Sequence, residues 1–172
     1  MNRLRQAMVW LRRINRCRGF GVQSPTDYRF VRYVINEHWP YYAYSELGKG
    51  DNWLRRKTGR LYFRLANDMQ PHTIADWVGF SDYLQAGCQK AVLTDEAKDV
   101  DLAVVPIKTD YHRLFNECNE QSVVVFHEIY KHPTYWHCIE HDSRVSVSFD
   151  LYYCGIVIFD KKRQPHHYII NF

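Results

Sequence analysis

The chain has 172 residues, of which 46% are apolar and 16% aromatic, so it can bury one sizeable core and has little room for two separate domains. No apolar run reaches the roughly 18 residues of a membrane span, and the N-terminus lacks the pattern of a signal peptide, so we expect a cytoplasmic protein. The five cysteines are dispersed and odd in number, which argues against a disulfide framework and against a cysteine-built zinc site.

The charge is divided unevenly along the chain. Residues 1–64 carry 14 Lys and Arg against 4 Asp and Glu, a net +10, whereas residues 65–172 carry 9 against 15, a net −6. We therefore divide the chain into a basic helical N-terminal extension over 1–70 and an α/β domain over 71–172, which together form one compact unit. The basic segments, among them the clusters around Arg12 and Arg18, either bind an acidic partner such as nucleic acid or dock on the acidic half of the same chain.

Three helices are expected before Pro71. Apolar residues at helical spacing, with arginines opposite them, predict an amphipathic helix over 3–16, which packs on a neighbouring helix or a second subunit or lies on a membrane. Ser24 and Pro25 supply the cap and first residue of a second helix over 25–38, and a third runs over 52–69. The 13 tyrosines and 5 tryptophans also favour a homodimer.

After Pro71 the pattern changes to short apolar runs over 72–78, 90–94, 100–107 and 122–130, separated by helical stretches over 81–87, 111–119 and 134–141. Such alternation predicts a parallel sheet that is buried on both faces. The link from Thr94 to Val100 is too short for a crossover helix, so either a segment is missing there or the two strands are not neighbours. The tail predicts an antiparallel hairpin with its turn at Cys154–Gly155 and a final strand at the sheet edge.

Three segments carry a resemblance to a known family: Cys17 to Pro25 (CRGFGVQSP), Arg60 to Leu65 (RLYFRL) and Val145 to Phe159. The chain resembles, over most of its length, small bacterial class I S-adenosylmethionine-dependent methyltransferase-like proteins, which commonly have His at the position of Gln23. The resemblance implies a Rossmann-like methyltransferase sheet with helices on both sides, antiparallel C-terminal strands and an N-terminal helical extension. Here the sheet is expected to be shortened.

The same resemblance implies where S-adenosylmethionine would bind. Asp76 matches the acid that ends the first strand, but of the glycine-rich loop that should follow only Gly79 remains, and Trp77 and Phe80 would occupy the space of the methionine moiety. Asp95 and Glu96 match the acid that binds the ribose. The segment that would form the adenine wall is missing between Glu96 and Val100, and the strand ending at Lys108 lacks its acid. We interpret the site as degenerate, with S-adenosylmethionine as the cofactor if there is one.

Two further groups of residues are candidates for chemistry. His127 and Glu128 end a strand at the carboxyl edge of the sheet, where a His/Glu pair suits acid–base work. The HxxEH sequence at His137, Glu140 and His141 places two imidazoles one helical turn apart, as zinc requires, with His127, Glu128 and His132 near in sequence; solvated surface histidines are the alternative.

Three functions follow from these patterns: a methyltransferase-like protein with a non-catalytic binding or assembly role, an active methyltransferase with a remodelled pocket, and a zinc hydrolase built on the HxxEH segment.

Overall fold

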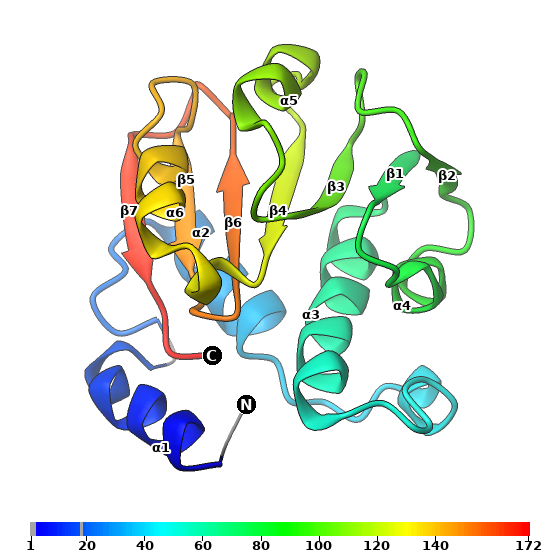
Figure 1. The fold of residues 1–172 in the computed structure, drawn as a ribbon, viewed down its shortest axis with the longest axis vertical. Coiled ribbons are helices and arrows are strands. Elements are labelled where there is room, and N and C mark those ends of the chain that lie inside the picture. The colour runs from blue at the N-terminus through cyan, green and yellow to red at the C-terminus, as the bar shows by residue number, and fades with distance from the viewer. Residues whose placement is uncertain (1–2, 18) are drawn as a thin grey trace.

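Seven strands form one mixed sheet in the order β2-β1-β3-β4-β6-β5-β7 in a computed structural model that describes residues 3–17 and 19–172 (Figure 1). The strands are β1 Thr73–Asp76, β2 Val92–Thr94, β3 Leu102–Pro106, β4 Val123–His127, β5 Val147–Asp150, β6 Cys154–Ile158 and β7 His166–Ile169. The α-helices are α1 Arg3–Arg12, α2 Pro25–Phe30, α3 Trp53–Met69, α4 Ser81–Gly87, α5 Tyr111–Glu117 and α6 Pro133–Glu140. Short 3₁₀ segments are η1 Ile14–Arg16, η3 Tyr42–Ser45 and η4 Ile129–Lys131, and η2 Val31–Ile35 is a π-helix.

The sheet is parallel on one side and mixed on the other. Strands β2, β1, β3 and β4 run parallel, whereas β6 is antiparallel to both β4 and β5, and β7 pairs in parallel with β5 at the edge. Because β1 lies between β2 and β3, the two strands joined by the short link are not sheet neighbours, which was one of the two alternatives for that link. The expected C-terminal hairpin and edge strand are confirmed.

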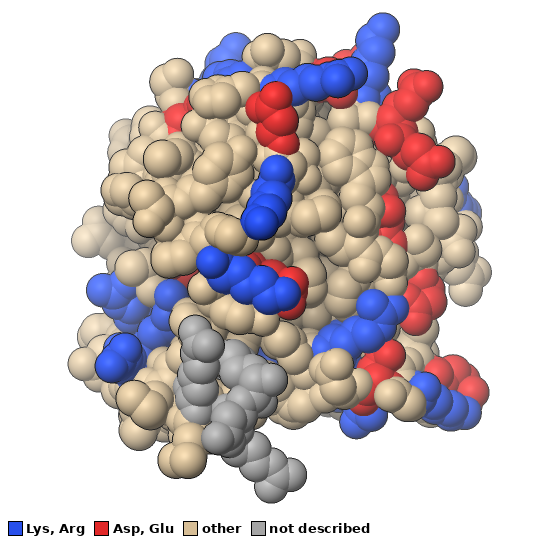
Figure 2. Space-filling model, in the orientation of Figure 1, with Lys and Arg blue, Asp and Glu red and all other residues tan. Residues whose placement is uncertain are grey.

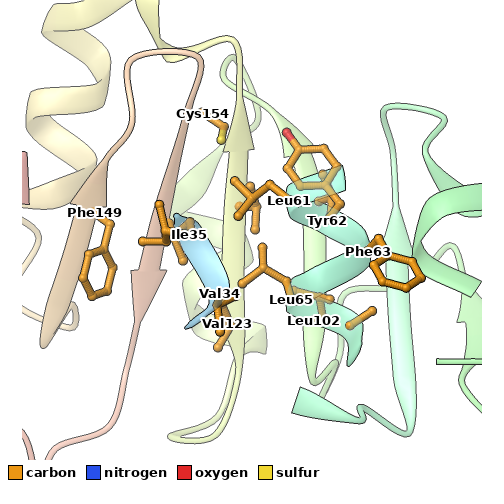
Figure 3. Packing of buried hydrophobic residues seen from close by; sticks show 14 of the residues in the cluster. Val34, Ile35, Leu61, Tyr62, Phe63, Leu65, Leu102, Val123, Phe149 and Cys154 are labelled. Atoms are coloured by element: carbon orange, nitrogen blue, oxygen red, sulfur yellow. The ribbon is translucent and has the colours of Figure 1, made fainter. Parts of the chain in front are cut away.

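Helices cover both faces of the sheet. The first core cluster joins α2, η2, α3 and α4 to one face of the sheet, and Figure 3 shows Leu65 of α3 close to Leu102 and Val123 of the strands. The second cluster joins α5 and α6 to the other face through Phe115, Trp136 and other apolar residues. Helices from both sides of residue 70 therefore share one core with the sheet.

Hydrogen bonds of nearby side chains explain where α2, its continuation η2 and α3 begin or end. Ser24 accepts a hydrogen bond from the Asp27 amide to begin α2, and the helix continues as η2 only to Ile35, three residues short of the predicted end. The buried Arg64 guanidinium donates to the carbonyls of Val34 and Ile35, which satisfies acceptors that the ending helix leaves open. Asn52 caps α3, whose predicted bounds are confirmed.

Helix α1 ends at Arg12, four residues before the predicted end, and its apolar residues Met8 and Leu11 are exposed. Two contacts hold α1 on the C-terminal part of the chain. The guanidinium of Arg13, which follows the helix, lies 2.9 Å from the Asp150 carboxylate at the end of β5. The Asn171 side chain donates a hydrogen bond to the Trp10 carbonyl. Basic side chains gather near α1 in Figure 2. The Arg13–Asp150 pair joins the basic and acidic halves of the chain, and such docking was one of the two alternatives for the basic segments. Arg18 lies outside the described residues. No helix among the described residues is both long and apolar enough to span a membrane.

The predicted turn at Cys154–Gly155 is wrong. Both residues are in β6, and the chain turns at residues 151–153, where Tyr152 has a φ of 69°. Gly155 serves packing, since a Cβ there would lie 2.3 Å from the Trp136 ring of α6. Glycine at this position lets α6 approach the sheet.

Candidate functional site

A cleft of about 610 Å³ opens at the carboxyl edge of the sheet, where β1, β3 and β4 end. Ligands of α/β proteins bind at this edge because loops from several parallel strands meet there. The cleft is lined by Asn52, Leu54, Arg55, Val78, Phe80, Pro106, Ile107, Lys108, His127, Glu128, Lys131 and His132. His127 and Glu128 therefore lie where the sequence predicted them.

The loop after β1 is closed around the carboxylate of Asp76. One carboxylate oxygen accepts hydrogen bonds from the Val78 and Gly79 amides, both at 3.1 Å. The other accepts from the Phe80 amide at 2.6 Å and from the Ser81 hydroxyl at 2.7 Å. A carboxylate has about four acceptor positions, so those of Asp76 are occupied by its own loop. The same bonds occupy three amides that an open loop would offer to a ligand.

The two aromatic residues of this loop take different places. Phe80 is 2% exposed, and its ring packs against the rings of Tyr62 and His127 at 4.9 Å and 5.1 Å between centroids. Trp77 is 37% exposed, and its indole donates to the Asp95 carbonyl at 3.2 Å. Phe80 thus forms the floor of the cleft, whereas Trp77 extends toward the end of β2.

Asp95 and Glu96 line a second cleft, of about 570 Å³, together with Trp77 and residues of α5. The Glu96 amide donates to the Thr94 hydroxyl, which fixes the turn after β2. The residues proposed from the resemblance are therefore divided: Asp95 and Glu96 border the second cleft, while the loop that holds Asp76 and Gly79 contributes Val78 and Phe80 to the first.

His127 is held as a neutral imidazole. Its Nδ1 atom lies 2.6 Å from the Tyr62 hydroxyl, and burial lowers the pKa of the ring to about 4, with the charges of Lys131 and Arg55 acting in the same direction. Burial also raises the pKa of Tyr62. Both groups are therefore neutral and share one hydrogen bond between the phenol oxygen and Nδ1.

Glu128 has other partners. It adopts a left-handed backbone conformation with φ 61°, and its carboxylate accepts hydrogen bonds from Lys131 and from the Tyr130 hydroxyl. Burial opposes ionisation of this carboxyl group, but the bond from Lys131 and the neighbouring charges outweigh it and lower its pKa. His127 and Glu128 thus share a cleft while each is bound to a different neighbour.

The first cleft is predominantly basic. Arg55, Lys108 and Lys131 line it together with the acidic Glu128; Arg55 pairs with Asp51 and Lys131 with Glu128, whereas Lys108 has no ion pair within the part of the chain that the structure describes. Arg55 also links α3 to the β1 loop, since its guanidinium donates to the Gly79 carbonyl at 2.6 Å and lies over the Phe80 ring. These three basic residues were not predicted as site residues. Lys108 and Lys131 follow strands that end at this edge, and Arg55 belongs to the basic run that it forms with Arg56 and Lys57.

His137 and Glu140 lie on α6, and His141 directly follows it, on the opposite face of the sheet from α3. Among the described residues, His137, Glu140 and His141 form a group whose ligand atoms all lie within 4.8 Å of one another. His127, Glu128 and His132, predicted as further ligands, line the first cleft instead. Trp136 and Ile139 form the buried side of this helix.

Comparisons with known proteins gave no match: no family model, curated protein or solved structure corresponds to this chain.

Proposed function

We propose that this chain is a methyltransferase-like scaffold that binds a small anionic ligand in the carboxyl-edge cleft and does not use S-adenosylmethionine. The resemblance to methyltransferase-like proteins is supported by the parallel half of the sheet followed by antiparallel C-terminal strands. The proposal rests mainly on Asp76, whose carboxylate is fully engaged by the Val78, Gly79 and Phe80 amides and by Ser81.

The amides at the start of α4 are the usual place for an anionic part of a ligand, because they point outward and carry partial positive charge. In this chain an internal carboxylate takes that place. Of the basic side chains around the first cleft, Lys108 makes no ion pair among the described residues, whereas Arg55 is paired with Asp51 and Lys131 with Glu128. The positive charge of Lys108 favours a ligand with a phosphate or carboxylate group.

Calorimetric titration with S-adenosylmethionine and S-adenosylhomocysteine tests the first half of the proposal. We expect no heat of binding up to about millimolar ligand. This result would mean a Kd above about 1 mM, which corresponds to a standard binding free energy less favourable than about −4 kcal/mol. Micromolar binding that is weakened in Asp95→Asn and Glu96→Gln would instead favour the rival function, an active methyltransferase with a remodelled pocket. Asp76 is unsuitable for this test, because its substitution would open the loop whether or not the cofactor binds.

Thermal unfolding in inorganic phosphate and in citrate tests the second half. We expect either anion to raise the melting temperature of the wild-type protein, since a ligand that binds only the folded state stabilises it. Lys108→Ala should reduce the effect, whereas Lys90→Ala, an exposed lysine just before β2 at the opposite end of the sheet, should not. Equal responses of the two variants would contradict binding in this cleft.

The HxxEH segment gives less support to a hydrolase. A hydrolytic site needs a cleft that holds substrate beside the metal, and the two clefts described above are lined by other residues. The side chains of His137 and His141 are 68% and 49% exposed. These residues are better placed to bind an ion than to enclose a substrate.

A further inference from the structure

We infer that His137 and Glu140 of α6 and His141, which directly follows it, form with His167 of β7 a binding site for a divalent transition-metal ion such as Zn²⁺. This inference is independent of the proposed function. It adds a residue from another element, 26 positions beyond His141 in the sequence, that no sequence motif indicated.

His137, Glu140 and His141 are already arranged around a common point. One ligand atom of each residue lies within 4.8 Å of those of the other two, and Glu140 Oε1 lies 3.1 Å from Nδ1 of His137. Ligand atoms of a tetrahedral zinc ion, each about 2.0–2.2 Å from the metal, lie about 3.3 Å apart. The observed spacings therefore need only small rotations of exposed side chains to accept the ion.

His167 brings a third imidazole to this group. Its ring stacks on that of His141 with 4.5 Å between centroids, and the ring of His141 lies 4.1 Å from that of His137. Three neighbouring imidazoles and a carboxylate supply the nitrogen and oxygen ligands that zinc prefers.

The Nδ1 atoms of two of these rings are already within hydrogen-bond distance of protein oxygen atoms. Nδ1 of His141 lies 3.0 Å from the carbonyl oxygen of His137, and Nδ1 of His167 lies 2.9 Å from the Ser148 hydroxyl. Metal-binding histidines almost always make such a bond through the nitrogen that does not bind the metal, because it fixes the orientation of the ring. Both rings are thus oriented with Nε2 left for an ion.

The carboxylate of Glu140 also lacks a strong partner in the protein. Its side chain is only 14% exposed, and its ion-pair partners within residues 3–17 and 19–172 are the two histidines, with no Lys or Arg among them. A largely buried carboxylate is costly unless a cation compensates it. A divalent ion between Glu140 and the imidazoles would do so and would join α6 to the edge strand β7.

Calorimetric titration of metal-free protein with ZnCl₂ at neutral pH, repeated with MgCl₂, tests this inference. We expect one Zn²⁺ per chain with a Kd in the micromolar range, no comparable binding of Mg²⁺, and at least a tenfold loss of zinc affinity in both His141→Ala and His167→Ala. His166→Ala is the matched control: it neighbours His167 on the same exposed strand, but its ring lies against Tyr168, so its zinc affinity should be unchanged. Melting temperatures without zinc show that each variant is folded.

Absence of zinc binding to the folded wild-type protein would overturn the inference. So would equal affinities of the wild type and His141→Ala. A loss in His141→Ala with full affinity in His167→Ala would overturn the assignment of β7. A Co²⁺-loaded sample gives a second readout, since tetrahedral nitrogen and oxygen coordination produces a visible absorption band that His167→Ala should change and His166→Ala should not.

Discussion

The imidazole of His127 and the phenol of Tyr62 form a 2.6 Å hydrogen bond that joins the end of β4 to the middle of α3 directly under the cleft. The bond connects the carboxyl edge of the sheet to the helix that covers it. Because burial disfavours the protonated imidazole, His127 also makes the stability of the fold depend on pH.

We predict that stability decreases as the pH falls from 6.5 to 4. In this window the unfolded chain takes up a proton at His127, while the folded protein, with a pKa of about 4 at this residue, does not. The difference amounts to at most about 3 kcal/mol. Urea unfolding across this pH range should therefore show a steeper loss for the wild type than for His127→Gln. His112→Gln, which changes an exposed histidine, should keep the wild-type slope; identical slopes for all three proteins would contradict the prediction.

Asp27→Asn should destabilise the protein by about 3 kcal/mol. The carboxylate is 3% exposed and accepts hydrogen bonds from Arg163 and Tyr168, both at 3.0 Å, so its loss leaves buried groups without their charged partner. Denaturant unfolding measures the change. Asp160→Asn is the control, since Asp160 contacts the same Arg163 at 3.4 Å with a more exposed side chain and should cost less than about 1 kcal/mol. Similar costs for both variants would show that burial of Asp27 is not decisive.

Gly87→Ala should cost about 1–3 kcal/mol, although alanine normally stabilises a helix by up to about 1 kcal/mol relative to glycine. A Cβ at this position in α4 would lie 2.3 Å from the main-chain oxygen of Phe63 in α3. The backbone of α3 has no room to yield, so the two helices must separate. Thermal and denaturant unfolding should reveal the loss, and Gln85→Ala, at an exposed position of the same helix, should be nearly neutral. A stabilised Gly87→Ala protein would show that the contact is not tight.

Lys57 should titrate near pH 8. Burial against Trp53 and Phe172 lowers its pKa to about 8, and the charge of Arg64 adds to the effect. Since the folded state favours the neutral amine, Lys57 makes the fold more stable as the pH rises from 8 toward its ordinary value of about 10.4. NMR titration of ¹³C-methylated lysines should show one resonance with this midpoint, and that resonance should be missing in Lys57→Arg. Its persistence in the variant would assign the titration to another lysine.

Much of the fold was predictable because its signals are local. The helix predicted over 52–69, ending before Pro71, corresponds to α3, and Ser81–Gly87 was predicted with the observed bounds of α4. Apolar runs located every strand of the parallel half. The errors lie where distant contacts decide: Gly155 looked like a turn residue, but its partner Trp136 is 19 positions away in the sequence and on another element.

The candidate site was predictable only in part, for the same reason. His127 and Glu128 could be placed at the carboxyl edge because they end a strand. The partner of His127, Tyr62, could not be assigned, since a hydrogen bond across 65 positions has no local signature. The self-contained hydrogen bonding of Asp76 was also not evident, because the sequence alone does not show which way a carboxylate turns.

The missing side chain at Gly155 has an effect that reaches the opposite side of α6. The Trp136 ring of α6 packs directly against the main chain of β6 at Gly155. His137, on the same helix, and His141, directly after it, lie on the side that faces His167, whose ring stacks on that of His141. A larger residue at position 155 would lift α6 away from the sheet and carry its histidines out of register with β7. A buried position without any functional group thus acts as a spacer that sets the distances on the molecular surface.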